Sequence, residues 1–198
     1  MRAILALAAT MSMVASASAQ ITSQYTELDT ERDCITIASS GEDEGDWADL
    51  VCPGYRGYPV LLFYSDVRES LFYGFPPEFD RVPDFMSFSG FNRVGPTIEW
   101  RLAPRNGVEV PFATIHRWFV DDPEFPGDET QVLVVRRVGQ LDDRQGCVVG
   151  FVVASGNANA NEQARRVADE QAREFACGAD QPAILSGTVP LPNFTFGY

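Results

Sequence analysis

Two apolar stretches decide the fold: TQVLVVRRV at residues 130–138 and CVVGFVVA at residues 147–154. Each is rich in β-branched residues, and each is short for a buried helix. Nearly continuous apolar character in a strand indicates that both of its faces are covered. We therefore expect these segments to be two central strands, joined by residues 140–146 and packed on both sides.

The segments that precede them indicate an antiparallel sheet. Residues 98–102 alternate between apolar and charged side chains, the period of two that is typical of a half-buried strand. Asn106-Gly107 is a tight-turn signal, and residues 108–120 form the expected returning strand. Further strands are expected at residues 34–38, 58–64 and 68–73, which makes about seven in all.

One helix is expected after the second apolar stretch. Asn159 can cap its N-terminus, with Glu162 completing a start that resembles a capping box. Apolar residues at helical spacing follow, namely Ala164, Val167, Ala168, Ala172 and Phe175. The predicted fold class is α+β, an antiparallel β-meander of about seven strands with one helix in the C-terminal half packed on the sheet.

The N-terminus has the features of an export signal. Arg2 precedes a short apolar run at residues 3–15, and Ala17-Ser18-Ala19 has the small-x-small form of a cleavage site. The apolar run is too short to span a membrane. We expect residues 1–19 to be a signal peptide and residues 20–198 to form one secreted α+β domain, periplasmic or extracellular, with no membrane span.

Four cysteines fit an oxidising compartment, where an even count indicates disulfides. They are Cys34, Cys52, Cys147 and Cys177. Three pairings are open, and we favour Cys34 with Cys52 and Cys147 with Cys177, because each pair flanks one supersecondary unit. A zinc site would lack paired C-x-x-C spacing, and His116 is the only histidine. We expect neither a metal nor a cofactor.

The charge balance narrows the range of partners. The chain has 28 acidic and 15 basic residues, a formal net charge of −13, and every basic residue is an arginine. Nucleic acid is not expected as a partner, because phosphate binding needs a basic face. Long-range electrostatics favours a cationic protein or peptide, chiefly by speeding its encounter. Solubility alone would also account for the acidity, and both interpretations stay open.

The candidate binding surface is a proline-rich aromatic stretch at residues 74–95. Its candidate binding residues are Phe75, Phe79, Phe85, Phe88 and Phe91. Long loops of this kind are often functional, and aromatic faces stack on sugars and contact partner proteins. The alternative is that these rings plug the open side of a small sheet.

No catalytic constellation is apparent. The chain has no G-x-S-x-G elbow, and the absence of lysine excludes Schiff-base chemistry. No residue is therefore assigned as catalytic. The predicted function is non-enzymatic binding of a cationic protein or an envelope glycan. The alternative is a periplasmic hydrolase of glycans or peptides that uses carboxylates or His116.

Five short motifs are distinctive. They are CPGY at residues 52–55, GYPV at 57–60, TIEWRL at 97–102, PFATI at 111–115 and NANANEQARRVA at 157–168. Together they resemble a family of exported proteins from proteobacteria that has no assigned activity. The resemblance covers most of residues 20–198 and implies export and a single domain. It implies no ligand and no catalytic residue.

Overall fold

The computed structural model describes residues 20–41, 45–78, 83, 85–122, 124–125 and 127–196. The predicted signal peptide, residues 1–19, lies outside them. The elements are β1 (Thr22–Glu27), β2 (Ile35–Ser39), β3 (Trp47–Cys52), the 3-10 turn η1 (Tyr55–Gly57), β4 (Val60–Ser65), β5 (Arg68–Tyr73), β6 (Met86–Phe88), β7 (Asn92–Arg105), β8 (Val108–Asp121), β9 (Glu129–Arg137), β10 (Val148–Val153), α1 (Ala160–Gln171), β11 (Ala183–Leu185) and β12 (Phe194–Phe196). No helix in the described part of the chain is long and apolar enough to cross a membrane.

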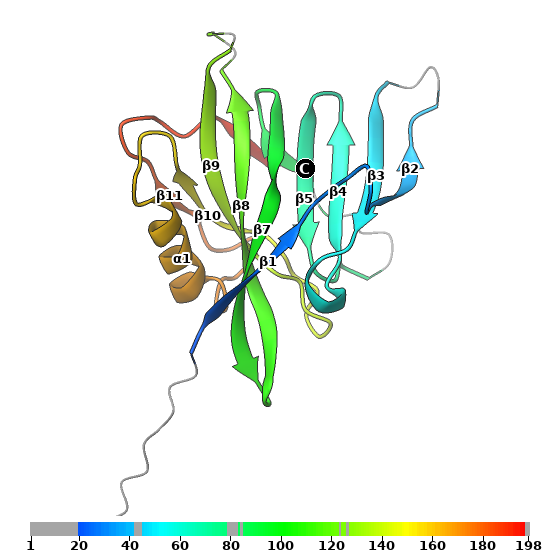
Figure 1. Cartoon of the computed structure of the whole chain (residues 1–198), viewed down its shortest axis with the longest axis vertical. Coiled ribbons are helices and arrows are strands. Elements are labelled where there is room, and N and C mark those ends of the chain that lie inside the picture. Colours follow the sequence, from blue (N-terminus) through cyan, green and yellow to red (C-terminus); the bar gives the residue numbers. More distant parts are fainter. Residues whose placement is uncertain are drawn as a thin grey trace, which may run out of the picture.

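The strands form three sheets, and the two larger ones can be followed in Figure 1. The large sheet has the order β1-β7-β8-β9-β10-β11, the small sheet has the order β2-β3-β4-β5, and β12 pairs with β6. Neighbouring strands are antiparallel except β10 and β11, which are parallel. The chain is therefore mostly β, with antiparallel sheets and one helix, as the sequence predicts.

The predicted count of about seven strands is wrong, because the described residues form twelve. The seven predicted strands correspond to β2, β4, β5, β7, β8, β9 and β10. Strand β1 is polar and is held by pairing with the distant β7, so no local apolar pattern marks it. Strands β6, β11 and β12 have three residues each, too few to establish a period. The large sheet is also mixed, because β11 adds in parallel after the helix.

Two apolar layers lie on opposite faces of the large sheet. Alternate residues of β8 and β9, such as Trp118 and Val134, face the layer shared with the small sheet. Their neighbours, such as Ile115 and Leu133, face α1. Strands β9 and β10 are thus covered on both sides, as their continuous apolar sequence predicts.

Helix α1 follows Asn159, but the predicted cap is wrong in detail. Asn159 makes no side-chain capping bond. Asn157 instead accepts a hydrogen bond from the Asn159 N–H at 3.1 Å, and its own amide donates to Val153 O and to Gln163 Oε1. An asparagine two positions earlier therefore organises the turn that leads into the helix.

Both favoured disulfides are present. Cys34 bonds to Cys52, which joins the segment before β2 to the end of β3. Cys147 bonds to Cys177, which joins the segment before β10 to the turn after α1. Each bridge closes one supersecondary unit, which is the pairing predicted from the sequence.

The two sheets meet at a pair of glycines. Gly74, after β5, forms a parallel bridge with Gly139, after β9. The Gly139 N–H donates to Tyr73 O at 2.9 Å, and the Phe75 N–H donates to Gly139 O at 2.9 Å. A Cβ on Gly139 would lie 2.4 Å from Phe75 O, so the contact requires glycine. This junction is one of the places where the backbone of the small sheet is bonded to that of the large one.

Candidate functional site

Four chain reversals lie at one end of the two sheets, the upper end in Figure 1. They connect β2 with β3, β4 with β5, β6 with β7 and β8 with β9. Backbone hydrogen bonds join them in series, from Asp66 N to Asp46 O, from Asn92 N to Val67 O and from Asp121 N to Phe91 O. We call this surface the acidic rim and define it as the described residues among 45–46, 66–69, 89–93 and 121–129.

The acidic rim has a large excess of negative charge. It carries eight carboxylates, on Asp46, Asp66, Glu69, Asp121, Asp122, Glu124, Asp128 and Glu129. Only two guanidiniums, those of Arg68 and Arg93, lie within it. Arg93 already pairs with Glu129 at 2.7 Å and lies over the ring of Phe119. Most of the rim carboxylates are exposed, so their charge faces solvent.

The field of these carboxylates acts on Tyr64 in β4. Desolvation raises the pKa of the Tyr64 phenol, and the nearby Asp46, Asp66 and Glu69 raise it further, because a phenolate would meet like charge. Glu69 is itself half-buried, and desolvation raises the pKa of its carboxyl although it accepts a hydrogen bond from the Val94 N–H at 2.7 Å. Three rim carboxylates from different reversals and strands therefore lie close enough to act on one side chain of β4.

Elsewhere on the described surface, most arginines are paired within the protein. Salt bridges to carboxylates are made by Arg32, Arg101, Arg105, Arg137, Arg144, Arg165 and Arg166. Arg56 and Arg173 instead lie over aromatic rings. The pairing leaves few guanidiniums to neutralise the rim.

Two phenylalanines are exposed on the acidic rim. Phe91 lies in the β6–β7 reversal and is 59% exposed, and Phe125 lies in the β8–β9 reversal and is 61% exposed. Large apolar side chains at this exposure lose water when a partner covers them. The rim thus combines negative charge with two apolar contact points.

The predicted aromatic residues divide between core and surface. Phe88 is fully buried against Trp118, Phe151 and Phe194. Phe75 and Phe85 are half-buried, the first against Tyr58 and the second beneath Arg68. Phe79 lies outside the described residues, as does much of the loop around it. Phe91 is therefore the candidate that reaches the acidic rim.

Comparison with known proteins adds no assignment. A scan of family models, a search of curated proteins and a search of solved structures all find no match. The resemblance to a family of exported proteobacterial proteins therefore stays a prediction.

His116 lies in the core, where it contacts other protein groups on both ring nitrogens. It is 1% exposed. Its Nε2 lies 2.7 Å from Gly95 O and must carry the proton, since a carbonyl can only accept. Its Nδ1 then accepts from the Tyr73 hydroxyl at 2.7 Å. Neither nitrogen is free to exchange a proton with a substrate, which favours a structural role.

Acid should destabilise the protein through this histidine. Burial lowers the pKa of His116 to about 4, against about 6.5 in an unfolded chain. Below pH 6.5 His116 therefore binds a proton in the unfolded state but not in the native state. The free energy of unfolding falls with pH until about pH 4. We expect this residue to account for a loss of about 3 kcal/mol between those values.

Urea unfolding of the wild type and of His116→Gln, measured from pH 7.5 to pH 4, checks this prediction. The substitution is expected to flatten the pH dependence, because glutamine does not take up a proton in this range. Carboxyl groups contribute equally to both proteins, so the difference between the two profiles reports on His116. Parallel pH profiles for the two proteins would show that His116 is not the group responsible.

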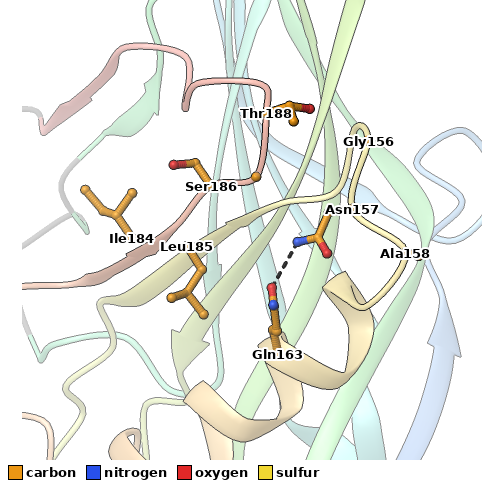
Figure 2. A pocket seen from close by; sticks show the side chains of 9 residues that line it. Gly156, Asn157, Ala158, Gln163, Ile184, Leu185, Ser186 and Thr188 are labelled. Carbon is orange, nitrogen blue, oxygen red and sulfur yellow. Dashed lines mark hydrogen bonds between the residues drawn. The ribbon is translucent and has the colours of Figure 1, made fainter.

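A shallow depression of about 410 Å³ lies beside the start of α1, as Figure 2 shows. It is lined by Gly156, Asn157, Ala158, Gln163, Ile184, Leu185, Ser186, Gly187 and Thr188. None of these side chains is a carboxylate, histidine or cysteine, so the depression offers no acid–base pair. Among the residues that the structure describes, no three His, Cys, Asp or Glu side chains are placed to hold a metal ion.

The acidic rim is thus the surface with the most distinctive chemistry. The sequence indicated an acidic protein, but it did not indicate that these acidic segments lie together on one surface. It also missed Phe125, whose only local signal is its place inside the acidic segment at residues 121–129.

Proposed function

We propose that this chain is an exported, non-enzymatic binding protein whose acidic rim captures a cationic protein. The observation that carries this proposal is the excess of eight carboxylates over two guanidiniums on four contiguous reversals. Two disulfides support export, because such bonds persist in oxidising compartments. Glycan binding and the hydrolase alternative stay predictions from the sequence.

Capture at the rim would proceed in two stages. Like-signed charges on one surface raise the local concentration of an oppositely charged partner and speed its encounter by about 10- to 1,000-fold. This attraction acts over a screening length of about 8 Å at physiological ionic strength. Phe91 and Phe125 would then bury apolar surface against the partner, which holds the complex after contact.

A matched pair of triple variants tests where the partner docks. The rim variant carries Asp66→Asn, Glu124→Gln and Asp128→Asn, all exposed positions. The control carries Glu31→Gln, Glu170→Gln and Glu174→Gln, which are exposed, lie outside the rim and remove the same net charge.

With lysozyme as the cationic probe at low salt, we expect the rim variant to associate about tenfold more slowly than the wild type. The association rate of the control should fall far less, because the charges removed from it lie outside the docking surface. Stopped-flow or surface-plasmon-resonance association rates provide the measurement. Equal losses in the two variants would mean that net charge alone attracts the probe and that the rim is not its site.

A further inference from the structure

One arginine is buried in the core between the two sheets. Arg136 of β9 is 2% exposed and lies directly opposite Thr114 of β8. Its Nη1 donates to Leu71 O of β5 at 2.5 Å, so it links the large sheet to the small one. The side chain thus places a guanidinium in the buried layer between the two sheets.

The remaining edge of this guanidinium has no protein partner. Arg136 Nε and Nη2 are buried and make no hydrogen bond, and neither does the hydroxyl of the facing Thr114. No carboxylate of the described residues forms a salt bridge with Arg136. Buried polar groups of native proteins nearly always have partners, and an unpaired buried charge is strongly unfavourable.

Other arginines of this chain show what such an edge binds. Arg101 donates from Nε and Nη2 to the two carboxylate oxygens of Asp169, at 2.8 and 2.6 Å. Arg165 uses the same two nitrogens on Glu99, at 2.7 and 3.1 Å. The Nε–Nη2 edge is a planar fork that suits an anion. In Arg136 this is the edge that no protein group fills.

The charge of Arg136 is also uncompensated. Burial lowers the pKa of Arg136 to about 10, which leaves it protonated at neutral pH. Its titratable neighbours are Tyr73 and His116. Burial raises the pKa of the Tyr73 phenol and lowers that of the His116 imidazole, so both side chains are uncharged at neutral pH. Water would satisfy the hydrogen bonds of the fork but not its charge.

We propose that the fork of Arg136 binds a small monovalent anion of chloride size inside the core, with the Thr114 hydroxyl as a further donor. A small anion is chosen because the fork is enclosed in the core, where Leu71 and Val134 nearby are each 1% exposed. The anion would neutralise Arg136 and so stabilise the contact between the two sheets. This site is independent of the acidic rim.

Chloride-dependent stability tests the proposal. Unfolding is followed in mixtures of sodium chloride and sodium gluconate, in which the chloride concentration varies and the ionic strength stays constant. Gluconate serves as the replacement anion because it is too large to be enclosed. Above the dissociation constant, each tenfold rise in chloride should favour the native state of the wild type by about tenfold. The stability of Arg136→Met should not depend on chloride. Thr114→Val should need a higher chloride concentration than the wild type for the same stabilisation.

A second measurement does not depend on the variants folding. Crystals of the wild type grown in sodium bromide should show an anomalous peak at hydrogen-bonding distance from Arg136 Nε and Nη2. Water density at that position, together with wild-type stability that does not change when chloride replaces gluconate, would overturn the proposal.

Discussion

Replacing Gly139 with alanine is expected to lower the free energy of unfolding by about 3 to 4 kcal/mol. The new Cβ would lie 2.4 Å from Phe75 O and 3.0 Å from the ring of Phe72. Phe75 O is a backbone atom, so a simple change of side-chain rotamer cannot move it away from the new Cβ. Relief of the clash would break the hydrogen bonds that join Gly139 to Tyr73 and Phe75.

The matched control is Gly187→Ala. A Cβ there would have its nearest neighbour at 3.9 Å, and the substitution should change stability by less than about 1 kcal/mol. Urea or thermal unfolding of both variants provides the comparison. If Gly139→Ala is as stable as Gly187→Ala, the two sheets do not meet at the glycine pair in solution.

Removal of the Cys147–Cys177 disulfide is expected to cost about 3 to 4 kcal/mol. The bridge spans 30 residues, including α1 and its packing against β10, so it restricts the unfolded chain over a long loop. The double substitution of both cysteines by alanine tests this without leaving a free thiol.

The second disulfide offers an internal comparison. Cys34–Cys52 spans 18 residues, and its removal should cost slightly less in the same entropic account. Unfolding of the two double variants under identical oxidising conditions checks the order. An unchanged midpoint without Cys147–Cys177 would mean that α1 is held by its apolar face alone.

Sequence patterns predicted the fold class because the central strands are strongly patterned. Strands β9 and β10 are continuous apolar runs, and β7 and β8 flank an Asn-Gly turn. Strand β1 could not be found in this way, because its polar residues become a strand only by pairing with β7, 70 to 80 residues later. Pairing between distant segments is a tertiary effect that local patterns do not encode.

The acidic rim illustrates the same limit. The segments that contain Asp46, Asp66 and Asp121 are far apart in the sequence and each has the composition of an ordinary solvated turn. Hydrogen bonds between reversals bring them to one surface. The burial of Arg136 could not be predicted either. Arg136 lies at the end of an apolar strand, and it is buried because the small sheet packs against it.

The most direct test of the rim as a binding surface uses the absence of lysine. The only primary amine is the N-terminal one, so amine coupling attaches every molecule in one orientation. Lysozyme is then passed over this surface at about 20 and about 200 mM sodium chloride. We predict binding at low salt, with an association rate that falls at least about tenfold at the higher salt while dissociation changes less. No binding at low salt, or an association rate indifferent to salt, would contradict capture by the acidic rim.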